Sequence, residues 1–373
     1  MIYTEAFMKE FIKNNFRPFL TALGITAFVI ICMYHTSCHI TPEGITLITN
    51  DCKSAKIEGF KIDGSDIHVE FSKNVKVEQC FVVEASDDLE KVSSIENFYN
   101  CENKMQVEWE DDPDEFIIHY KLKEKTKIGK CYELYSVVRD SAGSSLSFAL
   151  PFFGENDHFP DLVISEINEA YSNKEALSEY IELYALSSGN LFGLELISAS
   201  NERHYPLPDI EINKGEYIVV HLRGDENDKN CVTEKGSNLN LSKARGSVAA
   251  RDIWINSSES ALNSTAEIVL LNNKAKNKLL DCVMYCKKDY ALSNKDWKTE
   301  SLCKYAALCS DAGLWNKPCI PENAVYSNER KSISYISRTN IEGLKNSPER
   351  NNDAKCWTGT AKSKMTPGKK NAW

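Results

Sequence analysis

The segment that decides the fold is residues 161–184, DLVISEINEAYSNKEALSEYIELY, in which two apolar runs flank a polar stretch. Alternate residues of a β-strand lie on the same face of a sheet. We therefore expect Tyr180 or Ile181 to lie on one face of the sheet with its partners two residues along. The two runs predict a pair of strands at the start of an all-β domain.

Apolar runs of the same kind continue downstream. Two of them, AEIVLLNN and LLDCVMY, flank a polar turn rich in Lys and Asn and predict a hairpin. The dipeptide Lys214-Gly215 predicts another turn, ahead of the apolar run YIVV. Residues 192–196 precede the segment 205–208, residues 212–220 turn through Lys214-Gly215 into an apolar strand, and residues 266–273 and 279–285 form the hairpin-like pair.

The order of these runs resembles the bacterial lamin-tail domain. The shared pieces are I-S-E-I, E-Y-I-E-L-Y, G-x-x-L, K-G-x-Y-I-V-V, E-I-V-L-L, D-x-V-x-Y, the segment 331–334 followed by Arg338, then Trp357 and T-P-G-K-K-N. The resemblance covers residues 161–371. It implies an Ig-like β-sandwich in a spirochaete-like exported lipoprotein. It also implies a family that is generally not catalytic, so no catalytic residues are carried over.

Two stretches depart from a minimal domain of this kind, at about residues 223–261 and 286–328. The second includes residues 291–314, which have helical character. Its Trp and Cys residues predict that it folds onto the sandwich and is stapled there by disulfides. These residues are Trp297, Trp315, Cys303, Cys309 and Cys319. Long connections often carry function, so any binding site is expected in these insertions.

Residues 54–154 predict a separate β-sandwich. The run IHVEF at 67–71 alternates strictly, as a half-buried strand does. The segment YELYSVVRDSAGSSLSF at 132–148 resembles the closing hairpin of bacterial Ig-like or fibronectin-type modules. With a linker at 155–160, the predicted fold class is all-β: two Ig-like β-sandwich domains in tandem, the second with long, partly helical insertions, after an N-terminal signal segment.

One loop of this first sandwich is expected to be acidic. Its carboxylates crowd around Pro113 and are Glu108, Glu110, Asp111, Asp112, Asp114 and Glu115. Clustered carboxylates can bind Ca²⁺, but the loop lacks the spacing of an EF-hand. We favour a solvated hairpin tip whose charges keep sheet edges apart, and we expect no metal or other cofactor.

The N-terminus predicts export. Basic residues up to Arg17 precede an uncharged stretch with an apolar core at 19–33, the polarity of a signal peptide. The sequence His35-Thr36-Ser37-Cys38 resembles the cleavage site of a bacterial lipoprotein. This predicts a signal peptide at 1–37, lipid attachment at Cys38 and a linker at 38–53. An ordinary signal peptide, or an uncleaved anchor extending to Ile40, stays open.

Net charge limits which classes of partner are expected, and the cysteine count limits the disulfides. The net charge of −10 over 373 residues argues against a general nucleic-acid binder. The region from Glu329 to Trp373 is nevertheless basic, and either contacts an anionic lipid or polymer or is solvated. Removing Cys32 and Cys38 from the 13 cysteines leaves an odd number, so at least one thiol has no disulfide partner within the chain.

No catalytic motif is present. The sequence has no G-x-S-x-G, P-loop, G-x-G-x-x-G or H-E-x-x-H, and His204 and His221 come with no identifiable nucleophile. We therefore expect a non-catalytic, lipid-anchored surface or periplasmic protein of the bacterial cell envelope. It would present Ig-like domains for binding, adhesion or envelope organisation.

The expected contacts are with the membrane, through the lipid anchor, and with an unidentified envelope or extracellular protein or polysaccharide; no specific nucleic acid is expected. The alternative is an envelope hydrolase, or an accessory module to one, with a nucleic-acid or phosphoester substrate.

Overall fold

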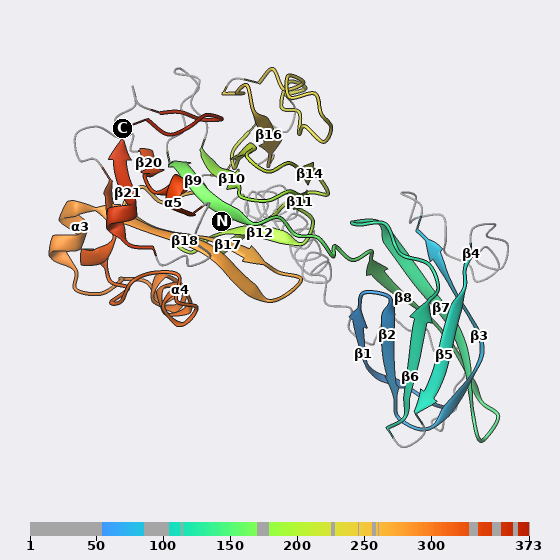
Figure 1. Ribbon diagram of the computed structural model, residues 1–373. Coiled ribbons are helices and arrows are strands. Elements are labelled where there is room, and N and C mark those ends of the chain that lie inside the picture. The colour runs from blue at the N-terminus through green and yellow to red at the C-terminus, as the bar shows by residue number, and fades with distance from the viewer. Residues whose placement is uncertain are drawn as a thin grey trace, which may run out of the picture. The chain divides into compact units, whose positions relative to one another are not determined.

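The computed structural model (Figure 1) describes most of the chain beyond residue 53. The predicted signal peptide 1–37, the linker 38–53 and Cys38 lie outside the described residues. No helix among the described residues is long and apolar enough to span a membrane. The described residues are 54–85, 104–112, 115–169, 179–224, 228–244, 246–255, 259, 261–327, 335–344, 352–360 and 365–372.

The chain divides into two compact units. The first runs to Phe152, except that Thr126–Cys131 belongs to the second, which continues from Phe153. Strands make up most of the regular structure in both, which confirms the all-β prediction.

The first unit is a pair of four-stranded sheets around one apolar core. Alternate residues of its strands point into this core, so the strict alternation predicted for residues 67–71 is confirmed. One sheet has the order β1 (Ile57–Asp63), β2 (Asp66–Phe71), β6 (Ile117–Leu122) and β5 (Val107–Asp112). The other has the order β4 (Lys104–Met105), β3 (Val75–Glu84), β7 (Cys131–Asp140) and β8 (Ser145–Phe153).

The predicted acidic loop is wrong for residues 108–112, which belong to strand β5. This segment pairs in full register with β6, and the backbone hydrogen bonds gained there outweigh the preference of acidic residues for turns. The carboxylates stay in water at the sheet edge, where Glu108 pairs with Lys123 at 3.0 Å. Pro113 and Asp114 lie outside the described residues.

The second unit is built from two larger sheets and a short two-stranded pair, β11 (Gly189–Asn190) with β14 (Glu211–Ile212). The six-stranded sheet has the order β16 (Arg251–Trp254), β15 (Tyr217–His221), β10 (Tyr180–Ala185), β9 (Leu162–Asn168), β20 (Tyr335–Arg338) and β21 (Trp357–Thr360). The five-stranded sheet has the order β13 (Arg203–Pro206), β12 (Leu194–Ser198), β17 (Ala266–Asn273), β18 (Lys278–Lys287) and β19 (Val325–Ser327). Apolar residues of both sheets share one core.

Strands β9 and β10 are buried on both faces. Their inner face packs in the shared core. On the opposite face, Val163 and Tyr184 pack against Ile341 and Leu344 of α5 (Ile341–Leu344). Helix α5, which lies far along the chain from β9 and β10, therefore buries the second face of these strands.

A buried polar cluster joins the two sheets. The Arg338 Nη2 donates to Asp281 Oδ2 at 2.6 Å, and both side chains are 0% exposed. The Ile164 N–H donates to the same oxygen at 2.8 Å, and Asn352 Nδ2 donates to Oδ1 at 2.7 Å. The guanidinium carbon lies 4.5 Å from the centre of the Trp357 ring. Strands β9 and β20 and residue 352 are thus bonded to one carboxylate, which belongs to β18.

A second buried cluster holds residues 365–372 against the six-stranded sheet. Glu166 and Glu182 are directly paired across β9 and β10. The backbone N–H of Gly368 donates to Glu182 Oε2 at 2.5 Å, and that of Thr366 donates to Glu166 at 3.3 Å. Burial raises the pKa of both carboxyls, and the charge of Glu166 raises the pKa of Glu182 further. Since two adjacent buried carboxylates repel each other, this pair favours a protonated form.

Both predicted insertions contain regular structure. The first adds strand β16, which runs parallel to β15 at the edge of the six-stranded sheet. The second is partly helical, as predicted, and covers the five-stranded sheet, with α4 below β17 and β18 in Figure 1. Its elements are α3 (Lys288–Ser293), α4 (Glu300–Asp311), the 3₁₀ helix η3 (Pro321–Asn323) and β19; a further 3₁₀ helix, η4 (Ala354–Cys356), precedes β21.

Candidate functional site

The helical insertion is attached to the second unit by one face of α4. The Thr299 hydroxyl caps this helix by accepting from the Leu302 N–H at 3.3 Å. The buried positions Leu302, Tyr305, Ala306 and Cys309 follow the spacing of an apolar helix stripe and join the core of the unit. The predicted folding of this insertion onto the sandwich is confirmed.

The opposite side of the insertion leaves apolar side chains in water. Leu292 of α3 is 78% exposed, Leu308 of α4 is 43% exposed and Tyr326 of β19 is 38% exposed. We call these three exposed residues and the pocket of the same insertion, described next, the insertion surface.

The pocket of the insertion surface has a volume of about 260 Å³. Its wall is fixed by Trp297, whose Nε1 donates to the Cys319 carbonyl at 2.9 Å. The Cys303 thiol in turn donates to the Trp297 carbonyl at 3.1 Å. The lining residues are Asp296, Trp297, Cys303, Ala306, Ala307, Ser310, Cys319 and Ile320. It is a largely apolar wall with one carboxylate and one hydroxyl, a composition suited to binding.

The predicted disulfide staple of the insertion is absent, because Cys303, Cys309 and Cys319 are free thiols in the structure. Apolar packing of Trp297 and the α4 stripe holds the insertion instead. Burial raises the pKa of the Cys286 thiol to about 12 and also raises the pKa of Cys319. Since the thiolate is the reactive form, these thiols are poor nucleophiles.

A second pocket, of about 280 Å³, lies where the insertion meets η4. It is more polar than the first and carries both signs of charge. The Asn316 Nδ2 donates to Asp353 Oδ2 at 3.1 Å, which ties its two sides together. Its lining residues are Trp315, Asn316, Lys317, Glu322, Asn323, Asp353, Ala354 and Lys355.

The two histidines singled out from the sequence lie in different sheets. His204 of β13 contacts Glu195 at 3.1 Å, half-exposed on the five-stranded sheet. His221 ends β15, is fully buried and contacts Asp252 at 2.8 Å. Its ring stacks on Trp254, with ring centres 3.9 Å apart. No shared site brings these histidines together, and the His221–Asp252 pair is packed inside the unit.

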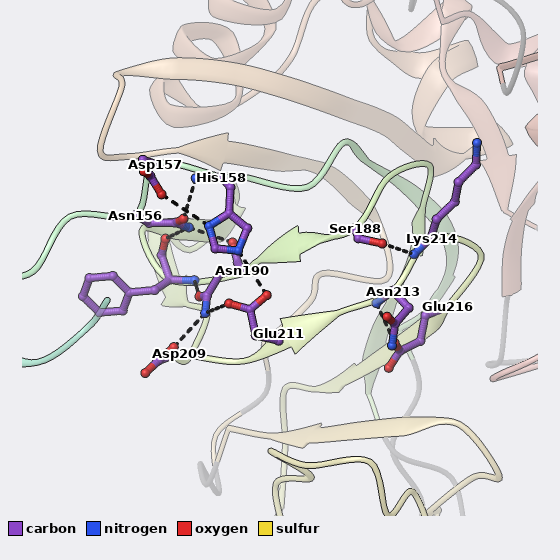
Figure 2. A network of polar contacts seen from close by, with 11 residues as sticks. Asn156, Asp157, His158, Ser188, Asn190, Asp209, Glu211, Asn213, Lys214 and Glu216 are labelled. Carbon is purple, nitrogen blue, oxygen red and sulfur yellow. Dashed lines mark hydrogen bonds and ion pairs between the residues drawn. The ribbon is translucent and has the colours of Figure 1, made fainter. Parts of the chain in front are cut away.

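A polar network fixes the predicted linker 155–160 to the second unit (Figure 2). The Asn156 amide donates to the carbonyls of Asn190 and Phe192 at 2.8 and 2.9 Å. The Asn190 amide donates to carboxylates of Asp209 and Glu211, both at 2.8 Å.

His158 completes this network. Its Nε2 lies 3.2 Å from Glu211, and that hydrogen bond raises the pKa of His158. The Asn190 amide donates to both Asp209 and Glu211, so these carboxylates have hydrogen-bond partners within the network. Across the described ranges, no group of three or more His, Cys, Asp or Glu side chains is placed to hold a metal ion.

Comparison with known proteins places the similarity in the second unit. A family model, TP_1001_2nd (protein second domain), matches residues 160–358. A protein of Treponema pallidum (strain Nichols), named only as an uncharacterized protein, is 27% identical over 168 residues. The match covers 44% of this chain and 42% of that relative, so the chain spans less than half of the relative's length.

Solved structures with local similarity include two of the bacterial S-layer protein SbsC. Its N-terminal part is 14% identical, with a TM-score of 0.22 over 62% of this chain and 43% of that one. The structure rSbsC(31-844) is 12% identical, with a TM-score of 0.22 over 59% of this chain and 39% of that one. Similarity at this level does not relate the folds.

Proposed function

The chain belongs to the TP_1001_2nd (protein second domain) family, and from this premise we propose that it is a non-catalytic protein of the bacterial cell envelope that binds a partner protein through the insertion surface. The observation that carries the proposal is the exposure of Leu292, Leu308 and Tyr326 on an insertion whose other side is firmly packed. Exposed apolar side chains and a pocket on the same insertion support its use as a protein-binding surface.

The proposed location rests on the N-terminal sequence. The basic residues, the apolar core at 19–33 and Cys38 support export followed by lipid attachment. A lipid at Cys38 would place both units outside the cytoplasmic membrane, on linker 38–53. Acyl-chain labelling of the intact chain tests this, with Cys38→Ala as the variant that should lose the label.

The Ig-like character of the two units is part of the same proposal. In the first unit, the order β1-β2-β6-β5 in one sheet and β4-β3-β7-β8 in the other supports it, because Ig-like sandwiches divide their strands in this way. In the second unit, Asp281, Arg338 and Trp357 of the lamin-tail motifs support it, because they meet in one buried cluster. Modules of this kind suit display and binding.

The binding proposal is tested by capture of a partner from a cell-envelope extract. Leu292→Ser and Leu308→Ser alter exposed side chains and should leave the fold intact. We expect the double variant to lose capture at least tenfold. Leu241→Ser is the matched control, because Leu241 is an exposed leucine, at 45%, in the other insertion. Equal capture by wild type, double variant and control would contradict the assignment of this surface.

The hydrolase alternative has its own test. Purified chain would be incubated with nucleic-acid and phosphoester substrates. The raised pKa values of the Cys286 and Cys319 thiols support the absence of thiol catalysis. Turnover that co-elutes with the protein and disappears in a His221→Gln or Asp252→Asn variant would overturn the non-catalytic proposal.

A further inference from the structure

We infer that the first unit carries a site for a divalent transition-metal ion of the zinc type, formed by His68, His119 and Glu110. The site lies on the outer face of the β1-β2-β6-β5 sheet. It is independent of the insertion surface, which belongs to the second unit.

The two histidines are brought together by strand pairing. His68 of β2 and His119 of β6 are direct partners across the sheet. Both strands alternate, so that Ile67, Val69 and Ile118 fill the core and the histidines point outward. The Nδ1 atoms of the two rings are 2.5 Å apart, and the ring planes are 82° apart with centres at 4.7 Å.

This geometry suits one positively charged species held between the two Nδ1 atoms. Two nitrogens at this distance cannot both carry a proton, so at least one lone pair points toward the other ring. A metal ion can occupy that position in place of a shared proton. With Zn–N bonds of about 2.0–2.1 Å, two nitrogens of a tetrahedral site lie about 3.3 Å apart. The rings need to separate by less than about 1 Å to reach this spacing, a small change for partly exposed side chains.

The third ligand comes from the next strand. Glu110 of β5 is the direct partner of His119, on the side away from His68. Residues directly opposite in antiparallel strands have Cβ atoms about 4.5–5.5 Å apart, on the same face. Glu110 is exposed and therefore able to rotate toward the pair. Since no three ligands are already gathered within the described residues, this rotation accompanies binding, and water completes the shell.

The surrounding charge favours a cation. Strand register places Glu70, Glu108 and Asp112 on the same outer face as the histidines, with Lys61 and Lys121 as basic residues there. A third lysine, Lys123, pairs with Glu108 at 3.0 Å. The two further acidic residues of this face are Asp63 and Asp66. Carboxylates thus outnumber lysines around the pair, and their field raises the local concentration of divalent cations. Imidazole nitrogens with a carboxylate oxygen are a ligand set that zinc accepts readily.

Calorimetric titration with Zn²⁺ tests the site in the full chain. Exposed thiols are first blocked with N-ethylmaleimide and bound metal is removed with a chelator, so that cysteines do not compete. We expect one zinc per chain, with the affinity falling at least tenfold in His68→Gln and in His119→Gln. His158→Gln is the matched control, because it removes a half-exposed histidine of the second unit, and should bind like wild type.

Folding and ligand identity are checked separately. The melting temperatures of the metal-free variants should match that of the wild type, and histidine-ring NMR signals should show zinc acting on two rings. Absence of zinc binding, or binding unchanged by both His68→Gln and His119→Gln, would overturn the site. Binding that is lost in these variants but unchanged in Glu110→Gln would overturn the assignment of Glu110 as third ligand.

Discussion

Replacing Asp281 with Asn should strongly destabilise the second unit. The change removes the negative charge that faces Arg338 across 2.6 Å, in a place where both side chains are fully buried. Asn has almost the same volume, so no cavity is created. A guanidinium keeps its charge in proteins, so Arg338 is left without its ionic partner in the core.

The expected loss follows from that desolvated charge. Removing one partner of a buried ion pair costs about 3–5 kcal/mol. For a unit of this size, each kcal/mol shifts the melting temperature by about 2–4 °C, so the expected decrease is about 6–20 °C. Arg338→Met should cause a similar loss. The double variant should be more stable than the sum of the single losses, because neither charge is left unpaired.

Differential scanning calorimetry of the four proteins measures these effects. Lys304→Met is the matched control, because the Lys304–Glu202 pair is 3.2 Å long but exposed, at 57% and 54%, and its loss should leave the transition unchanged. The reasoning is refuted if Asp281→Asn shifts the transition of the second unit no more than this control does. Strict additivity of the single variants would also contradict it.

Three further predictions concern the second unit. Glu182→Gln should raise the melting temperature near neutral pH, with a gain that shrinks toward the ordinary carboxyl pKa of 4.5. A raised folded-state pKa gives stability that is present below the unfolded pKa and lost as pH rises through the folded value; parallel melting profiles would contradict this. Trp297→Ala should lower the free energy of unfolding by about 3–5 kcal/mol in urea titrations, and a loss below about 1 kcal/mol would show that the ring is not packed. Gly189→Ala should lower the melting temperature sharply, because a Cβ there would lie 2.5 Å from the His158 carbonyl oxygen; an unchanged melting temperature would rule out that contact.

The sequence predicted strands both where one face meets solvent and where both faces are buried. In β2, the alternation of IHVEF is visible because its outward residues are polar. In β9 and β10, the apolar runs predicted the strands but did not indicate that both faces are buried. The cover there comes from residues 341–344 and 365–372, and the pattern within one strand carries no information about distant segments.

Three residues of the lamin-tail motifs lie together in the structure. Asp281, Arg338 and Trp357 were recognised only as parts of a resemblance, and they meet in one buried cluster. Their pairing could not be derived from spacing, because 57 residues separate Asp281 from Arg338 along the chain. The acidic run at 108–112 shows the opposite error, in which composition predicted a loop and β-pairing overrode it.

The candidate sites were only partly visible in the sequence. The helical insertion was a predicted binding region, but the exposure of Leu292 and Leu308 depends on which face of each helix is packed. His68 and His119 occupy outward positions of two alternating runs, which was a usable signal. What places them opposite each other is the register of β2 with β6, which no local pattern specifies.

The contact between residues 365–372 and the first strands of the second unit has a consequence for biosynthesis. Thr366 bonds to Glu166, 200 residues upstream. At about 5–20 residues per second, a ribosome needs about 10–40 s to make that stretch. The first unit can complete its sheets while the rest is still nascent, whereas Glu166 of β9 and Glu182 of β10 still lack their bonds to Thr366 and Gly368. A chain stalled before residue 365 would therefore present a finished module joined to an open one, a form well suited to recognition by chaperones and proteases.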